Sequence, residues 1–155
     1  MSICSKCNRH YYYMEIAGDV AKNSTSHYLH GCVIVKGGVI ISTGYNNYSK
    51  GKYRSIHSMH AEMDAIRKLP PLYKSRMISI DLIIIRINKE GLLRNSAPCC
   101  KCLEHLSRMN SKTKYRLRHI YYSTASGGII KEKFTDLLNS DTKHMSLRFR
   151  RLQKK

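Results

Sequence analysis

The chain has 155 residues and a formal net charge of +18, from 28 lysines and arginines against 10 aspartates and glutamates. This length predicts a single domain over residues 1–155, with a core large enough that disulfides are not needed for stability. No apolar run is long enough to cross a bilayer and no secretion signal is visible, so we expect an intracellular, mainly cytoplasmic protein without a membrane partner. Six cysteines in such a chain are typical of metal-binding or reduced thiols.

The first expected elements are a helix and a hairpin. After a Cys/His-containing segment at 1–10, apolar residues recur at helical spacing over 12–22. Two runs rich in β-branched residues then flank Lys36-Gly37-Gly38, which is a turn sequence, so residues 31–45 predict a β-hairpin. A polar loop with several tyrosines and lysines follows over 46–57.

The middle of the chain alternates between helical and strand patterns. Methionine, isoleucine and leucine side chains at spacings of three and four predict a helix over 58–69, and a buried-strand run follows over 80–87. Asn95 and Ser96 offer caps for a second helix, for which Pro98 suits the first turn. Another strand is expected over 118–123.

The direction of the last strand has two interpretations. Residues 125–128 can turn the chain directly back, so that 129–134 pairs antiparallel with the preceding strand, and this is the arrangement that we favour. Alternatively, the briefly helical segment 134–139 separates that strand from a late, parallel one at 145–149.

Two short motifs carry most of the chemical information. His60-Ala61-Glu62 supplies a histidine and a carboxylate, and Pro98-Cys99-Cys100-Lys101-Cys102 supplies two cysteines three residues apart. Three protein ligands around zinc leave a fourth position for water, which distinguishes a catalytic site from a closed structural one. A glutamate nearby can carry protons to and from that water.

This combination resembles the zinc-dependent cytidine/deoxycytidylate deaminase superfamily, whose signature is H-x-E followed by P-C-x-x-C. The resemblance implies a three-layer α/β/α sandwich with a mixed five-stranded sheet, and a homo-oligomer. It also implies Zn²⁺ held by His60, Cys99 and Cys102, with Glu62 as the catalytic acid/base. Within the superfamily, free-nucleoside deaminases return the last strand directly, whereas the deoxycytidylate and tRNA branches bring it in parallel.

Candidate substrate contacts lie beside these motifs at Asn46, Tyr48, Ala61 and Ala97. The resemblance gives Asn46 a contact to the base or sugar, although asparagine also suits a left-handed turn there. Tyr48 belongs to a tyrosine-containing loop whose rings can stack on a base. Ala97 occupies a position where many tRNA adenosine deaminases carry glutamate, which weakens an adenosine-deaminase interpretation.

A second metal site is an additional hypothesis. Cys4, Cys7 and His10 have spacings of three, and further donors lie downstream at Cys32, His27 and His30, with Cys32 as the leading candidate for the fourth ligand. Cys-x-x-Cys is a common zinc half-site, but the irregular spacing to the second half leaves simple free thiols as the alternative.

Positive charge concentrates toward the C-terminus, where residues 101–155 carry +10 and the tail 148–155 is the densest basic run. Such charge attracts phosphate on a nucleotide or a nucleic acid, and a basic tail leaves a nuclear location open. The leading hypothesis is hydrolytic deamination of cytosine in a nucleoside or nucleotide. The alternatives are an RNA or single-stranded DNA cytosine or adenosine deaminase, and a non-catalytic zinc-binding scaffold.

Overall fold

The computed structural model describes residues 5–48, 58–73 and 76–140, with only the backbone described for 5–8 and 58. It contains two sheets and four helices in these ranges. The helices are α1 (Ser5–Ala21), α2 (Ala61–Arg67), α3 (Cys100–Lys112) and α4 (Phe134–Asn139). The strands are β1 (Leu29–Lys36), β2 (Val39–Tyr45), β3 (Asn47–Tyr48), β4 (Ser58–Met59), β5 (Ile78–Ile87), β6 (Leu93–Arg94), β7 (Tyr115–Ser123) and β8 (Ile129–Lys133). None of the described helices is both long and apolar enough to span a bilayer.

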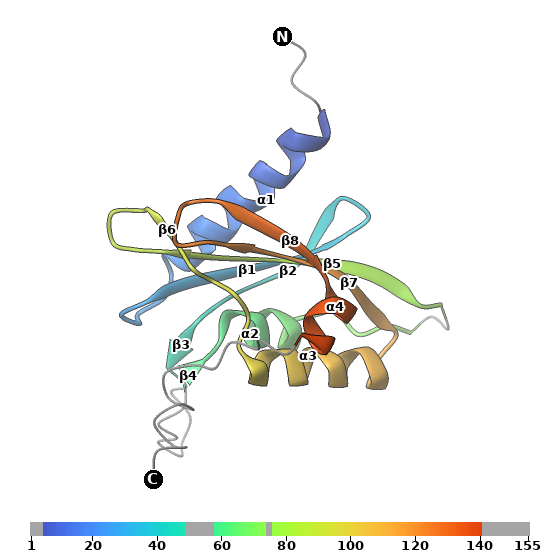
Figure 1. The fold of residues 1–155 in the computed structure, drawn as a ribbon. Helices are drawn as coiled ribbons and strands as arrows, with labels where there is room; N and C mark the ends of the chain where they lie inside the picture. The colour runs from blue at the N-terminus through green and yellow to red at the C-terminus, as the bar shows by residue number, and fades with distance from the viewer. Residues whose placement is uncertain (1–4, 49–57, 74–75, 141–155) are drawn as a thin grey trace.

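The large sheet is the middle of three layers, with α1 on one face and α2, α3 and α4 on the other (Figure 1). Its strand order is β2-β1-β5-β7-β8, and the short β6 pairs with the end of β5. Strands β5 and β7 are parallel, and the other pairs in the sheet are antiparallel. The predicted α/β/α sandwich with a mixed sheet is therefore confirmed, with β6 as a sixth strand.

The last strand follows the favoured prediction. β8 runs antiparallel to β7, with Ser123 opposite Ile129 and His119 opposite Lys133. The turn between them contains Gly127 at a φ of 84°, a conformation that glycine adopts without strain. Helix α4 follows directly, as the helical pattern over 134–139 predicts, while the alternative strand at 145–149 lies outside the described residues.

Side chains of the central strands alternate between two apolar layers. On β1, Cys32 and Ile34 belong to the cluster that includes residues of α2 and α3, whereas Val33 and Val35 belong to the cluster that includes α1. β5 divides in the same way, with even-numbered residues from Ile80 on the α2/α3 side and odd-numbered ones on the α1 side. Burial on both faces explains why these strands appear as continuous apolar runs in the sequence.

Two glycines let helices approach the sheet from opposite sides. A Cβ on Gly31 of β1 would overlap the backbone oxygen of Ala17 in α1. A Cβ on Gly44 of β2 would overlap backbone atoms of Ala61 and Ala65 in α2. The glycine on β2 therefore sets how closely the N-terminal part of α2 lies against the sheet.

Several predicted helix boundaries are wrong. α1 begins at Ser5 and includes part of the 1–10 segment, and α2 is shorter than 58–69 because β4 precedes it. α3 begins at Cys100, with Cys99 as its N-cap, so Pro98 lies outside the helix. The predicted caps have other partners: Asn95 Oδ1 accepts from the amide of Ala97 at 2.9 Å, and Ser96 Oγ donates to the carbonyl of Ile84 at 2.7 Å.

Candidate zinc-binding active site

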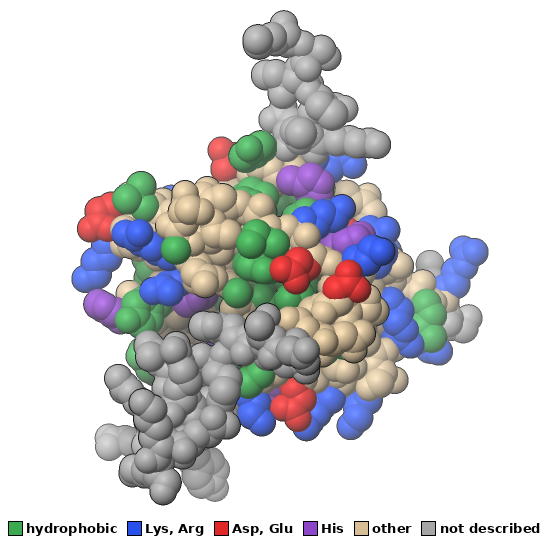
Figure 2. Space-filling model, in the orientation of Figure 1, with side chains coloured by type: hydrophobic (Ala, Val, Ile, Leu, Met, Phe, Trp, Pro, Cys, Tyr) green, Lys and Arg blue, Asp and Glu red, His purple; other side chains and the backbone are tan. Residues whose placement is uncertain are grey.

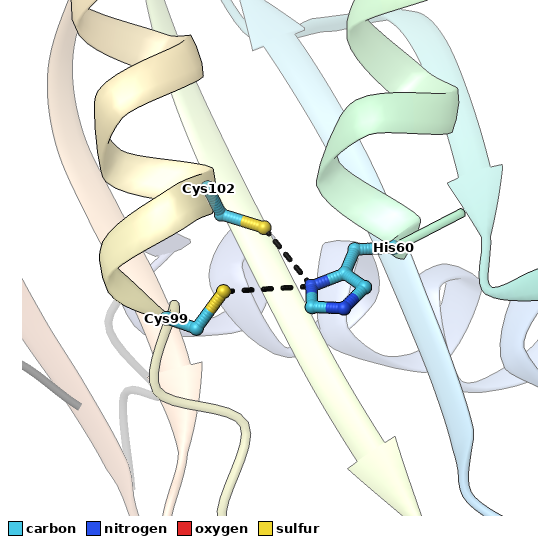
Figure 3. Close-up of side chains that lie close together, drawn as sticks. All are labelled: His60, Cys99 and Cys102. Atoms are coloured by element: carbon cyan, nitrogen blue, oxygen red, sulfur yellow. Dashed lines mark hydrogen bonds between the residues drawn. The ribbon is translucent and has the colours of Figure 1, made fainter. Parts of the chain in front are cut away.

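Two helix N-termini bring the three expected metal ligands together. His60 is the N-cap of α2 and Cys99 is the N-cap of α3, and neither side chain makes a capping hydrogen bond. Cys102 lies in the first turn of α3, on the same side as Cys99. Figure 3 shows both sulfur atoms directed at the same nitrogen of the His60 ring.

The three donor atoms are close enough to hold one ion. His60 Nδ1 lies 3.1 Å from Cys102 Sγ and 3.6 Å from Cys99 Sγ, and all three atoms lie within 4.8 Å of one another. Both cysteines are buried. Two sulfurs and one imidazole nitrogen are a recognised catalytic zinc set, which leaves one tetrahedral position for a fourth ligand. The residues present therefore fit zinc.

The three donors of the cluster are linked to one another by hydrogen bonds that shift their pKa values. The Cys102 thiol donates toward Cys99 Sγ, and this bond, with a second from His60, lowers the pKa of Cys99 to about 4. The same bond, together with burial, raises the pKa of Cys102, while the hydrogen bond to Cys99 raises the pKa of His60 to about 9. Without a metal the cluster thus holds protons between its donors, and metal binding would displace them.

Glu62 lies next to this cluster in the first turn of α2. Its side chain is buried, and burial raises the pKa of the carboxyl above its ordinary value, while the charge of His60 opposes that rise. Among the described residues, Glu62 belongs to no ion pair with a lysine or arginine. A buried carboxyl with a raised pKa is suited to accepting and returning a proton near neutral pH.

The four expected substrate contacts lie in different environments. Ala61 is fully buried at the start of α2, and Ala97 is half-buried and packs against the α2/α3 cluster. Tyr48 lies on β3 with 58% of its surface exposed. The remaining candidate loop residues, 49–57, lie outside the described part of the chain.

Asn46 has a clear structural role. Its Oδ1 accepts from the amide of His30 at 2.8 Å, and its Nδ2 donates to the carbonyl of Tyr28 at 2.6 Å. These bonds fix the start of β1 beside the end of β2. A further contact from Asn46 to the base or sugar stays a prediction.

The expected second metal site is wrong in one respect. His10 stacks on Tyr121 at a centroid distance of 4.8 Å, on the α1 side of the sheet. Cys32 is fully buried on the α2/α3 side. His10 and Cys32 therefore cannot hold the same ion, since the sheet separates them. Cys4 and the side chain of Cys7 lie outside the description.

One cross-strand row contains His30 on β1, Arg86 on β5 and Arg94 on β6. The sequence motifs indicate neither arginine as a site residue, and they indicate His30 only as a downstream donor for a second metal site. Burial, together with the charges of Arg86 and His60, lowers the pKa of His30 to about 4. The sequence does hold one signal for this row, since Arg86 interrupts the apolar run from Leu82 to Ile87.

A hollow of about 570 Å³ lies away from these residues. Its walls come from the C-terminal ends of α2 and α3 and from the start of β7, including Leu69, Met109 and Arg116. The metal ligands lie at the N-terminal ends of the same two helices. The hollow is therefore at the opposite end of the helix layer from the chemistry described above.

Comparisons with known proteins agree with this geometry. Residues 7–116, more than half of the chain, match the family model described as the cytidine and deoxycytidylate deaminase zinc-binding region. A search of curated proteins found no match.

Solved structures show the same fold. The apo dCMP deaminase from the cyanophage S-TIM5 is 17% identical, with a TM-score of 0.53 over 88% of this chain and 93% of that one. The cytidine deaminase from Burkholderia pseudomallei is also 17% identical, with a TM-score of 0.53 over 82% and 94% of the two chains. The enzyme from Mycobacterium leprae is 18% identical, with a TM-score of 0.51 over 84% and 98%. These structures show the fold, and the family model that matches more than half of the chain shows that it belongs to the family described by the cytidine and deoxycytidylate deaminase zinc-binding region.

Proposed function

We propose that this protein is a zinc-dependent hydrolase that converts cytosine, in a nucleoside or nucleotide, to uracil and ammonia. His60, Cys99 and Cys102 would hold the ion. Bound zinc supplies Lewis-acid activation of water, lowering the pKa of that water toward neutrality. The remaining chemistry is proton movement, and Glu62 is the residue placed to perform it.

Glu62 accounts for both proton transfers of the reaction. Its carboxylate accepts a proton from the attacking water and delivers it to N3 of the cytosine ring, as the oxygen adds at C4. It then accepts the remaining hydroxyl proton and passes it to the departing amine, so that water and cytosine yield uracil and ammonia. The raised pKa of Glu62 brings its proton affinity closer to neutral pH, where acid/base catalysis is most effective.

The observation that carries this proposal is a buried carboxyl beside three convergent metal donors. A structural zinc site has no need of such a carboxyl, and burying it is unfavourable, because burial disfavours its charged form. Residues that oppose stability in this way are typical of catalytic sites. A purely scaffolding role would leave Glu62 without a function.

A substrate screen tests the proposal. Zinc-loaded protein is incubated with cytidine, deoxycytidine, their monophosphates, and RNA and DNA oligonucleotides containing cytosine or adenine, and products are identified by mass spectrometry. We expect uracil-containing product from a cytosine nucleoside or mononucleotide. Product from oligonucleotides alone would favour the nucleic-acid deaminase instead, and no product from any substrate would favour the scaffold.

The panel includes both free nucleosides and phosphorylated forms because two features favour different substrates. The antiparallel β8 is the arrangement that the resemblance associates with free-nucleoside deaminases. The net charge of +18 favours substrates that carry phosphate. A homo-oligomeric assembly and an intracellular location stay predictions from the sequence.

A further inference from the structure

A row of nitrogen-rich side chains crosses three strands at the metal-site end of the sheet. His30 of β1 is the register partner of Arg86 of β5, and Arg86 is also the register partner of Arg94 of β6. Both pairings are antiparallel, so directly opposite residues project from the same face. The three side chains therefore share one face of the sheet.

That face is the one that carries the metal ligands. Ile84 precedes Arg86 by two residues and packs in the α2/α3 cluster, and strand alternation places Arg86 on the same side. Ile87 and Leu93 form the next register pair of β5 and β6, and both pack in the apolar cluster that includes α1, on the other face of the sheet. The alternation thus assigns Arg86 and Arg94 to the side of the sheet where α2 and α3 begin.

Arg86 has an incomplete set of partners in the described part of the chain. Its Nε is buried without a hydrogen-bond acceptor, and its Cζ lies 4.3 Å from the centre of the Tyr28 ring. The described ion pairs include neither Arg86 nor Arg94. Like charges directly opposite each other on neighbouring strands are destabilising, so two facing arginines without a carboxylate favour the binding of an anion.

The backbone around the row is held rigidly. The amide of Arg86 donates to Ser123 Oγ at 3.1 Å, and that hydroxyl donates to the carbonyl of Arg94 at 2.6 Å. Ser123 is fully buried. One side chain of β7 therefore fixes both arginine-bearing strands, which is the support that a binding site needs to hold its geometry.

The row also lies close to the metal donors. His30 is within electrostatic range of Arg86 on one side and of His60 and Cys99 on the other. In Figure 3, β5 runs behind the three ligands and its arrowhead passes beyond them. Figure 2 shows Lys and Arg side chains spread over much of the face it draws, in keeping with the net charge of +18. An anionic group bound at the row would be next to a base bound at the metal.

We propose that His30, Arg86 and Arg94 form a subsite for the phosphate group of a nucleotide whose base lies at the His60, Cys99 and Cys102 site. The proposal rests on the proposed function and narrows its substrate class to nucleotides. Arginine suits this task because its planar guanidinium can donate two parallel hydrogen bonds to phosphate oxygens. The ring of Tyr28 would hold the Arg86 guanidinium in place from one face.

The test compares substrates with and without phosphate. kcat and KM are measured for dCMP and deoxycytidine with wild type, Arg86→Gln and Arg86→Lys. Arg94→Gln is a second variant, at the exposed residue of the two-residue strand β6. Lys36→Gln is the matched control, since it removes one positive charge from the other end of β1. Binding of dUMP and of deoxyuridine is measured by calorimetry on the same proteins.

Arg86→Gln should lower kcat/KM for dCMP by about 10- to 100-fold, mainly through KM, as expected when a charge-assisted hydrogen bond is removed. Turnover of deoxycytidine should change by less than about twofold, and Arg86→Lys should recover part of the loss. Equal losses for both substrates, or no loss for either in the Arg86 and Arg94 variants, would overturn the proposal.

The binding measurement separates this proposal from the proposed function. If wild type deaminates nothing but binds dUMP more tightly than deoxyuridine, and Arg86→Gln removes the difference, the subsite stands and the function fails. If wild type deaminates deoxycytidine and binds both ligands equally, the function stands and the subsite is wrong. A parallel assay with a short single-stranded oligonucleotide shows whether the phosphate is a mononucleotide's or a polynucleotide's.

Discussion

The thiols of Cys99 and Cys102 have a neighbour that makes the metal assignment testable. Cys100 lies between them in the sequence but is only half-buried, and the described donor cluster does not include it. All three cysteines lie at the start of α3, and they differ mainly in whether the side chain belongs to the donor cluster. Cys100 is therefore a matched control for substitutions of Cys99 and Cys102.

In a background with serine at Cys4 and Cys7, we predict that Cys99→Ser and Cys102→Ser each lose most bound zinc. Cys100→Ser should keep it. Stability should fall with zinc content, because metal binding is coupled to folding. Elemental analysis with urea unfolding measures both. Full zinc in a variant lacking both Cys99 and Cys102 would contradict the assignment.

The ligands could be predicted from the sequence because their chemistry is local. Cys99 and Cys102 are three residues apart and so share one face of a helix, and the H-x-E and P-C-x-x-C motifs, each a few residues long, carry the resemblance that implies the complete ligand set. Arg86 and Arg94 could not be recognised in this way. Their meeting depends on the register of β6 against β5, which a two-residue strand hardly reveals in sequence. The hydrogen bonds of Asn46 to the start of β1 could not be predicted either, because they join residues 16 and 18 positions apart in the sequence, while the substrate contact that the resemblance implies for Asn46 stays a prediction.

At the scale of elements, the closeness of α2 to the sheet decides where His60 and Glu62 lie. Gly44 of β2 lies under the backbone of Ala61 and Ala65, with no space for a side chain. The hairpin and the buried strand β5 were predictable from their β-branched and apolar runs. The start of α3 was not predictable. Asn95 and Ser96 are residue types that often cap helices, but here their side chains form hydrogen bonds within and beside the loop that precedes α3.

We predict that Gly44→Ala pushes α2 outward, lowering stability by about 1–3 kcal/mol and weakening zinc binding. Gly18→Ala in α1 is the control. A Cβ at Gly18 meets no atom within 4 Å, and alanine in a helix should stabilise by about 0.5–1 kcal/mol. Thermal unfolding and zinc titration check both variants. If Gly44→Ala binds zinc with wild-type affinity, the close approach of α2 to Gly44 does not determine the position of the metal ligand His60.

The β7–β8 hairpin should show a pH dependence in alkaline solution. Burial, with the 2.6 Å hydrogen bond that Tyr122 donates to Glu132, raises the pKa of Tyr122 to about 12. An unfolded tyrosine titrates near pH ~10, so the folded state holds the proton more tightly. The resulting stability is fully present below pH ~10 and is lost as pH rises to about 12.

Tyr122→Phe should therefore lose less stability than wild type between those two pH values, although it is less stable at neutral pH. Urea unfolding at several alkaline pH values measures the slopes. Tyr73→Phe, at a ring that is 93% exposed, should keep the wild-type slope. If the free energy of unfolding falls with pH at the same rate in Tyr122→Phe and in wild type, Tyr122 does not cause the loss of stability in alkaline solution.

At the scale of the whole molecule, charge is the property that distinguishes this chain. The net charge of +18 is large for 155 residues, and the tail 148–155 adds five cations that lie outside the described residues. Long-range attraction of phosphate does not depend on fold and is screened by salt. The tail and the row at Arg86 should therefore have different effects. The tail should raise the rate at which phosphate-bearing substrates reach the protein, whereas the row should position a bound phosphate.

Deleting 148–155 is predicted to weaken oligonucleotide binding and to flatten its salt dependence, by a slope of about 0.7 for each phosphate of a single strand that the tail no longer neutralises. Turnover of deoxycytidine should be nearly unchanged. A variant with glutamine at the five basic positions separates charge from length. If the deletion unfolds the protein but the glutamine variant does not, the tail is part of the core.

Metal-dependent ammonia release is the decisive measurement for the proposed chemistry. Purified protein is stripped with a chelator, assayed with dCMP and with deoxycytidine, and assayed again after one equivalent of zinc is added. We predict no release from stripped protein, recovery with zinc, and a Glu62→Gln variant that binds zinc equally but is at least about 100-fold slower. Full activity in stripped protein, or in Glu62→Gln, would contradict a zinc-dependent reaction with Glu62 as its acid/base.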